Sequence, residues 1–197
     1  MINMIKTIII DWHGVIDRKT FEKFVHLISK ETNQDFLISK SLIQELANEW
    51  TLGRIEPNIF WQELKKLFKL NTSQIEKLKG YILNVDFNKE VINFLKENRK
   101  KYRMILLSDC PKDKAEIIKN SKNIDLFDNI CFSYEKHMSK ENPKLFSELL
   151  DQLHLFPNEC LYIDDNEKHI NTTSLMGLKT CFFKNIDSIV ATIQNKL

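Results

Sequence analysis

Side chains able to do acid, base or phosphate chemistry follow four separate hydrophobic runs of this sequence. In chain order they are Asp11 after Ile8-Ile9-Ile10, Ser108 and Asp109 after a run from Met104, Lys140 beyond a run from Asn129, and Asp164 and Asp165 after Leu161-Tyr162-Ile163. A buried strand that ends in a carboxylate must bring that charge to a metal, a partner or water. Because parallel strands bring their carboxyl ends to one edge of a sheet, we expect these groups to share one crevice.

The segment from about residue 20 to residue 83 carries apolar residues at helical spacing and no convincing strand. It predicts four short helices. Ser41 with Gln44, and Ser73 with Glu76, have the spacing of a capping box and mark two of the expected helix starts.

From residue 86 onward, expected helices alternate with expected strands at 104–108, 129–133, 160–164 and 179–183. Asn142 as cap and Pro143 at the first helical position start one of these helices. We therefore predict an α/β fold, with a Rossmann-like parallel sheet core and an inserted four-helix cap. The core would comprise residues 1–17 and 84–197, and the cap residues 18–83.

Composition narrows the partners of the chain. Its 197 residues are 43% hydrophobic, and 29 basic against 27 acidic residues give a net charge of +2. This balance indicates neither nucleic acid nor an anionic membrane, so a small-molecule substrate is expected. The four cysteines lack CxxC spacing and are expected to be reduced and mostly buried. With no signal peptide and no apolar run near the ~20 residues of a membrane span, we expect a soluble cytoplasmic protein.

The order and spacing of the four polar groups resemble the motifs of the haloacid dehalogenase-like hydrolase superfamily. Asp11 resembles the nucleophile of its motif hhhDxDGT, and Ser108 its second motif. Lys140 resembles the third motif, commonly KPDPxxF, and Asp164-Asp165 with Gly177 resembles the fourth. The predicted helical block lies where the type 1 cap of that superfamily is inserted.

The resemblance implies a Mg²⁺-dependent phosphatase with an aspartyl-phosphate on Asp11. Phosphoryl transfer to a carboxylate needs an ionised acid, cations around the non-bridging oxygens and a hydroxyl donor to one of them. Mg²⁺ suits a cluster of Asp11, Asp164 and Asp165, whose like charges would repel one another without a cation. In the family a further ligand is the backbone carbonyl two residues after the nucleophile, here that of His13. Ser108, Lys140 and Asp109 are expected to bind the phosphoryl group of a small phosphorylated substrate.

His13 is the main departure from the pattern, because the family's phosphatases usually carry there an Asp that acts as general acid and base. An imidazole has an ordinary pKa of ~6.5 and is able to do both tasks near neutral pH. A role in packing or in contact with the cap is the alternative. In that case turnover would be slow, and the protein would be a phosphate-binding or regulatory relative.

Other positions leave further alternatives. Asp11-Trp12 resembles the phosphonoacetaldehyde hydrolase branch, whose C–P bond cleavage needs a cap lysine such as Lys40. The segment 52–55 with Phe60-Trp61 resembles a cap segment of sugar-phosphatase-like branches, which makes Arg54 a candidate substrate contact. Trp50 and Trp61 are candidates too, although aromatic residues at helical spacing more often form a core.

Three more side chains lie near the motifs in the sequence. His137 stands where a Gly is common and His169 where an Asn often follows the paired acids, and each is expected to be a surface or loop histidine rather than a substrate contact. Cys110, next to the second motif, is expected to fill space rather than to react. The sequence names neither the substrate nor the oligomeric state.

Overall fold

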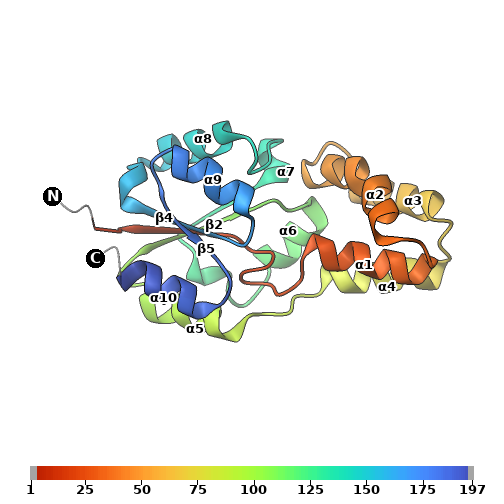
Figure 1. Ribbon diagram of the computed structural model, residues 1–197, viewed down its shortest axis with the longest axis horizontal. Helices are drawn as coiled ribbons and strands as arrows, with labels where there is room; N and C mark the ends of the chain where they lie inside the picture. Colours follow the sequence, from red (N-terminus) through yellow and green to blue (C-terminus); the bar gives the residue numbers. More distant parts are fainter. Residues whose placement is uncertain (1–3, 195–197) are drawn as a thin grey trace.

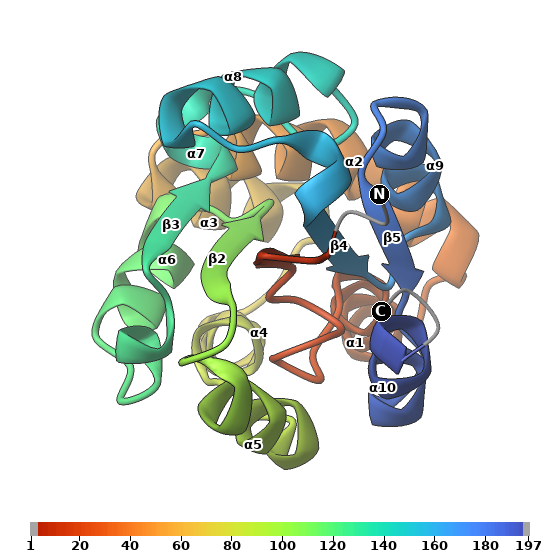
Figure 2. The same ribbon diagram turned by 90° about the vertical axis from the view of Figure 1, so that its left-hand side faces the viewer.

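The computed structural model describes residues 4–194, and within them one parallel sheet has the strand order β3-β2-β1-β4-β5 (Figures 1 and 2). Its strands are β1 (Thr7–Ile10), β2 (Arg103–Ser108), β3 (Asn129–Phe132), β4 (Cys160–Asp164) and β5 (Lys179–Phe182). In the central strand β1, Ile9 pairs with Ile105 on one side and Tyr162 on the other. A central strand of a sheet covered on both faces needs no polar alternation, which explains the unbroken isoleucine run.

Helices cover both faces of the sheet, and successive β1 residues face opposite layers. Ile8 and Ile10 pack in one cluster with α5 (Lys89–Asn98), α6 (Lys112–Lys119) and α10 (Ile186–Gln194). Ile9 packs in the other cluster with α8 (Pro143–Leu153) and α9 (Glu167–Leu175). The short helix α7 (Ser133–Lys136) follows β3, and the 3-10 turns η1 (Ile124–Leu126) and η2 (Pro157–Glu159) precede β3 and β4. Figure 2 shows α8 and α9 on one side of the strands and α5 and α10 on the other.

Residues 21–83, which we call the helical insertion, contain four helices between β1 and β2, as predicted. These are α1 (Phe21–Thr32), α2 (Phe36–Thr51), α3 (Pro57–Leu67) and α4 (Thr72–Leu83). They enclose a hydrophobic cluster of their own, in which the rings of Trp50 and Phe60 stack with centroids 3.7 Å apart. Figure 1 shows the helical insertion beyond one end of the sheet. The predicted fold class is confirmed.

The start of α2 was predicted wrongly. The helix begins at Phe36, where the Asp35 side chain accepts the backbone N–H groups of the first turn. Ser41 and Gln44 lie inside the helix, because Asp35 caps it earlier and the apolar periodicity extends to that point.

The start of α4 was predicted two residues late. Its capping box is made by Asn71 and Gln74, each of which accepts the other's backbone N–H. Ser73 and Glu76 have the same spacing but lie within the first turns of the helix. Spacing alone does not choose between two such pairs.

Other sequence expectations agree with the structure. Asn142 caps α8 with Pro143 in its first turn, and the predicted strands match to within one residue at each end. The cysteines are free and buried. Within the described residues, no helix combines the length and apolar character that crossing a membrane requires.

Two linkers, residues 11–20 and residues 84–88, join the sheet domain to the helical insertion, and they pair with each other. Arg18 donates its backbone N–H to the Asp86 carbonyl at 2.9 Å, and Asn88 donates to the Ile16 carbonyl at 2.8 Å. The first linker leaves the end of β1 and the second returns to α5. The insertion is thus attached beside the carboxyl end of the central strand.

Candidate active site

The turn after β1 brings the Asp11 carboxyl group to the carboxyl end of the sheet. Asp11 is 4% exposed, and its Oδ1 accepts the Trp12 backbone N–H at 2.6 Å. Gly14 follows with a φ of +83°, and a Cβ atom there would lie 1.9 Å from Oδ2 of Asp165. Glycine is therefore required at this position both by the backbone conformation and by the close approach of the turn to Asp165.

Lys140 bridges two carboxylates from neighbouring strands. Its Nζ lies 2.8 Å from Oδ1 of Asp11 and 2.7 Å from Oδ2 of Asp164, and its side chain is 2% exposed. The Lys140 backbone N–H donates to both carboxylate oxygens of Asp109, at 3.0 and 3.2 Å. By this contact Asp109 holds the segment that carries the lysine. The predicted contact of Asp109 with a substrate remains a prediction.

The electrostatics of this cluster are dominated by burial and by excess negative charge. Burial, together with repulsion from Asp164 and Asp165, raises the pKa of Asp11 well above its ordinary value despite the attraction of Lys140. Burial alone would lower the pKa of Lys140. The charges of Asp11 and Asp164 outweigh this effect, so that the pKa is raised above its ordinary value and the side chain stays an ammonium. Burial also opposes ionisation of Asp164, yet the Lys140 charge and a hydrogen bond from His169 lower its pKa, so this carboxylate stays ionised.

The carboxylates of Asp11, Asp164 and Asp165 fit a hard divalent cation. Each offers an oxygen, and these three oxygens lie within 4.8 Å of one another. The pKa of Asp165 is raised by burial and by the Asp164 charge, which a cation between the groups would offset. An all-oxygen donor set of this charge suits Mg²⁺ or Ca²⁺ better than the softer metals.

Ser108 and His13 lie together beside this cluster. Ser108 Oγ, fully buried at the end of β2, is 3.4 Å from His13 Nδ1. Burial and the nearby Lys114 ammonium lower the pKa of His13 to about 3, so its ring is neutral at neutral pH. A hydroxyl, a neutral imidazole, an ammonium and three carboxylates therefore lie together at one edge of the sheet.

Comparison with known proteins identifies the family of this chain. The model of the haloacid dehalogenase-like hydrolase family matches residues 5–172. The chain belongs to this family of hydrolases.

A curated relative is 26% identical over 193 residues, covering 90% of this chain and 91% of its own length: D-ribitol-5-phosphate phosphatase from Bacteroides thetaiotaomicron. A solved structure of a haloacid dehalogenase family enzyme from the same organism, in complex with magnesium and inorganic phosphate, has a TM-score of 0.76 and 25% identity, and the alignment covers 91% of this chain and 94% of that one. A predicted family hydrolase from Porphyromonas gingivalis has a TM-score of 0.75 at 20% identity, with 97% and 98% coverage, and shares the fold.

The candidate contacts of the helical insertion lie in different surroundings. Arg54 is half exposed and pairs with Glu49 at 2.8 Å, and its predicted substrate contact remains a prediction. Trp50 and Trp61 are buried in the insertion's own core, and Trp61 Nε1 donates to Asp113 of α6 at 3.3 Å. Both rings pack inside the insertion, and the hydrogen bond of Trp61 joins the insertion to the sheet domain.

The two histidines near the family motifs have different surroundings. His137 is exposed, as expected, and its Nδ1 lies 2.8 Å from the Leu52 carbonyl of the insertion. His169 is 7% exposed, and its Nδ1 lies 3.1 Å from Oδ2 of Asp164. The expectation of a surface or loop histidine was therefore wrong for His169. The helix α9 begins three residues after Asp164 and turns His169 back onto it.

Sequence reasoning also missed Tyr162, whose hydroxyl donates to Oδ2 of Asp164. A signal was present, because residues two apart in a strand point to the same side of the sheet. A tyrosine in a buried strand needs a partner for its hydroxyl, and the acid two positions later supplies one. Cys110, by contrast, fills space as expected: it is fully buried, and burial raises the pKa of its thiol well above the ordinary value.

Proposed function

We propose that this protein is a Mg²⁺-dependent phosphatase that hydrolyses small phosphomonoesters of sugars or sugar alcohols through a phosphorylated Asp11. The observation that carries the proposal is the Lys140 ammonium held between the carboxylates of Asp11 and Asp164. This contact places a nucleophile, Asp11, next to a cation for the phosphoryl oxygens, Lys140. The substrate class is supported by the phosphatase activity named for the 26% identical relative.

In the first step, a carboxylate oxygen of Asp11 attacks phosphorus, the bond from phosphorus to the alcohol oxygen breaks, and the leaving oxygen takes a proton from solvent water. In the second step, water attacks the phosphorus of this acyl phosphate, releasing inorganic phosphate and restoring Asp11. Lys140 and Ser108 bind the non-bridging oxygens during both steps. Asp11, Asp164 and Asp165, with the backbone carbonyl of His13, would hold Mg²⁺, which supplies positive charge to the phosphoryl group and offsets the repulsion around Asp11.

His13 is the group placed to move protons, because it stands two residues after Asp11 and beside the Ser108 hydroxyl. In our proposal its ring, which burial and the Lys114 charge keep neutral, accepts a proton from the attacking water. His13→Asp tests this role against a packing role. A large loss of rate supports proton transfer by His13, and a large gain shows that His13 impairs turnover.

In this proposal the helical insertion acts as a cap over the site. The cap comprises residues 18–83, which include the insertion, and the core comprises residues 1–17 and 84–197. Three contacts support it, since Thr51, Leu52 and Gly53 all touch the segment between β3 and Lys140. Ser133 Oγ donates to the Thr51 carbonyl at 2.6 Å, and a Cβ on Gly53 would lie 2.6 Å from the Tyr134 carbonyl. Arg54 follows directly and is our candidate for binding the distal part of the substrate. A cap excludes water from the reaction and sets specificity.

The alternative function is that of a phosphate-binding or regulatory protein with little turnover. The observation that favours it is His13 in place of the usual acid. Cleavage of a C–P bond has less support, because Lys40, its candidate lysine, lies on α2 over the ring of Phe36.

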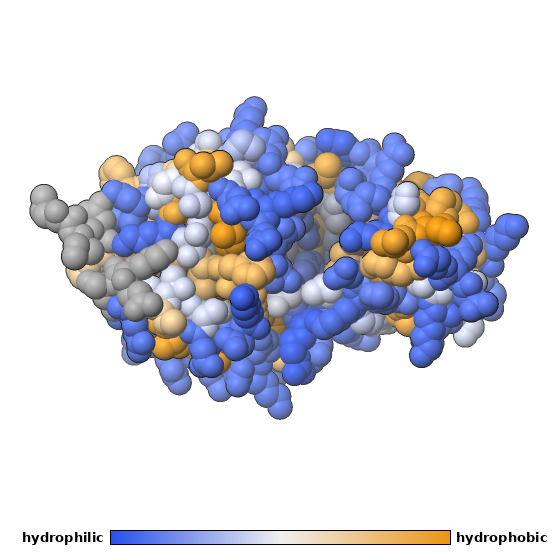
Figure 3. Space-filling view, viewed as in Figure 1, coloured by the Kyte–Doolittle hydropathy of each residue, from blue (hydrophilic) through white to orange (hydrophobic). Residues whose placement is uncertain are grey.

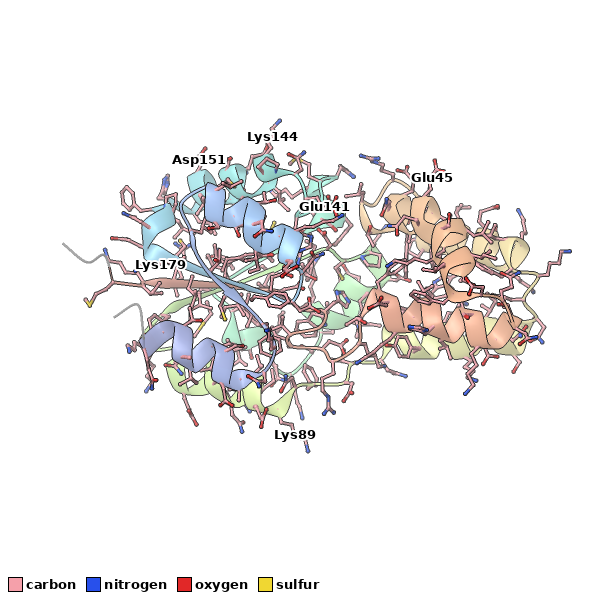
Figure 4. The ribbon with its side chains drawn as sticks, viewed as in Figure 1. Glu45, Lys89, Glu141, Lys144, Asp151 and Lys179 are labelled. Carbon is pink, nitrogen blue, oxygen red and sulfur yellow. The ribbon has the colours of Figure 1, made fainter. Side chains whose placement is uncertain are left out.

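Phosphate release from a panel of sugar phosphates, sugar-alcohol phosphates and p-nitrophenyl phosphate, with Mg²⁺ or with EDTA, tests the proposal. We expect Mg²⁺-dependent release that falls by more than about a thousandfold in Asp11→Asn, as for other removed nucleophiles. Asp151→Asn, an exposed aspartate on α8 (Figure 4), is the matched control and should keep full activity. Undiminished turnover by Asp11→Asn contradicts the covalent mechanism. Phosphate binding without turnover of any ester favours the binding protein.

A further inference from the structure

One oxygen of Asp164 receives three side-chain donors. Oδ2 accepts from Lys140 Nζ at 2.7 Å, from His169 Nδ1 at 3.1 Å and from the Tyr162 hydroxyl. The other oxygen, Oδ1, accepts the Asn166 backbone N–H at 2.8 Å. Tyr162 and Asp164 are fully buried and His169 nearly so, so these donors are shielded from water.

The contacts of Asn166 fix which nitrogen of His169 carries the proton. The Oδ1 atom of Asn166 accepts the Lys168 backbone N–H at 2.9 Å, which turns its amide nitrogen toward His169 Nε2 at 3.5 Å. An amide nitrogen only donates, so Nε2 accepts and Nδ1 bears the hydrogen that faces Asp164. His169 is thus a donor to Asp164 in its neutral form.

We propose that Tyr162 and His169 are positioning residues that keep the Lys140 ammonium shared between Asp164 and Asp11. The two donors saturate Oδ2 of Asp164 and spread its charge over several hydrogen bonds. Without either donor, Asp164 attracts Lys140 more strongly and draws it away from Asp11, where the phosphoryl group is transferred. This inference rests on the proposed function, since it concerns the cation that binds the phosphoryl oxygens.

Two pairs of variants separate the hydrogen bonds from the packing. Tyr162→Phe removes the hydroxyl and keeps the ring, which contacts Phe146 edge to face. Its matched control is Tyr102→Phe, because the buried Tyr102 hydroxyl has no hydrogen-bond partner among the described residues. His169→Leu removes the donor. His169→Asn places an amide nitrogen near the position of Nδ1 and should restore it.

The measurements are kcat and the affinity for inorganic phosphate in saturating Mg²⁺, by calorimetry, together with the thermal midpoint. Partners that orient a site group typically contribute ten- to a hundredfold, so we expect Tyr162→Phe and His169→Leu to lower kcat and phosphate affinity by about tenfold each. Tyr102→Phe should change neither quantity, and His169→Asn should recover most of both. Thermal midpoints show whether each variant is folded.

Wild-type kcat and phosphate affinity in Tyr162→Phe would overturn the inference, as would an equal loss in Tyr102→Phe. If His169→Leu does not fold, the comparison of Tyr162→Phe with Tyr102→Phe tests the inference by itself. A wild-type protein that binds phosphate but hydrolyses no ester overturns the proposed function alone, because the phosphate affinities of the variants still test the positioning of Lys140.

Discussion

Among residues 4–194, two lysines of the sheet domain are almost fully buried, and their surroundings differ in charge. Lys140 in the site faces the carboxylates of Asp11 and Asp164, with Asp165 beside them. Lys114 on α6 faces a single carboxylate, that of Asp17, at 2.9 Å. The site therefore carries more negative than positive charge, whereas the second pair is balanced.

The backbone of both linkers also forms hydrogen bonds with the balanced pair. Lys114 Nζ donates to the Asn84 carbonyl at 3.1 Å, and Oδ1 of Asp17 accepts the backbone N–H groups of Lys19 and Asp86. These groups lie where the chain leaves the sheet for the helical insertion and where it returns. Figure 3 shows the two parts of the molecule with a narrower, mostly hydrophilic region between them.

The comparison distinguishes a buried ion pair that holds the fold together from one that performs chemistry. A pair of balanced charge whose carboxylate oxygens already accept hydrogen bonds has no excess charge for a ligand to neutralise, and its loss affects stability. A cluster with unbalanced charge stores electrostatic repulsion, which a cation and a phosphoryl group relieve. Four predictions test this distinction.

Breaking the linker pair should have the largest effect on stability. Lys114→Met leaves Asp17 buried without its partner, and removing one member of a buried pair typically costs about 3–5 kcal/mol. Urea unfolding measures this loss, and adding Asp17→Asn should recover part of it. Lys112→Met, an exposed position on the same helix, is the control. A loss no greater than in the control would show that the linker pair is dispensable.

Breaking the site pair should reduce turnover more than stability. Lys140→Met removes the charge that faces the phosphoryl oxygens, and one such donor is worth about a hundredfold or more in kcat, or about 2.7 kcal/mol. The fold should tolerate the change better than Lys114→Met, because Asp11, whose pKa is already raised, takes up a proton instead. Steady-state kinetics and urea unfolding on the same sample compare the two effects. Turnover at the wild-type rate would remove Lys140 from the mechanism.

Magnesium should stabilise the folded protein through the site alone. At ten times its dissociation constant a ligand adds about 1.4 kcal/mol to the free energy of unfolding. We expect this increment in the wild type and in Lys114→Met, and its reversal by EDTA, but a smaller increment in Asp165→Asn. Calorimetric melting with and without MgCl₂ gives the values. An unchanged increment in Asp165→Asn would exclude that carboxylate as a ligand.

The smallest effect is expected for the exposed pair between the same linkers. Arg18 Nη2 lies 2.6 Å from Oδ1 of Asp86, but both side chains are about half exposed. Exposed pairs contribute little because water and salt screen them. Arg18→Gln should leave the urea midpoint equal to the wild-type value within experimental error. A shift comparable to that of Lys114→Met would show that this exposed pair stabilises the fold as much as the buried pair does.

Much of the site was predictable because its signals are local. Asp11, Ser108 and Asp164 follow hydrophobic runs directly, and parallel strands necessarily bring such ends together. The helical insertion was predictable from apolar spacing, since a helix that packs on its neighbours needs one apolar face. Helix starts were predicted less well, because several polar pairs have capping-box spacing and only one of them is used.

The sequence by itself determined the strands, the helical insertion, the carboxylates at the sheet edge and the family. Each strand, helix and motif depends on side chains within a few residues of one another, and the order of the motifs along the chain indicates the family. Only the tertiary structure decided that β1 is the central strand, that Lys114 neutralises Asp17 from 97 residues away, and that Tyr162 and His169 hold Asp164. Such partners depend on how whole elements pack, because a buried charge needs a partner in space and the spacing along the chain does not specify which one.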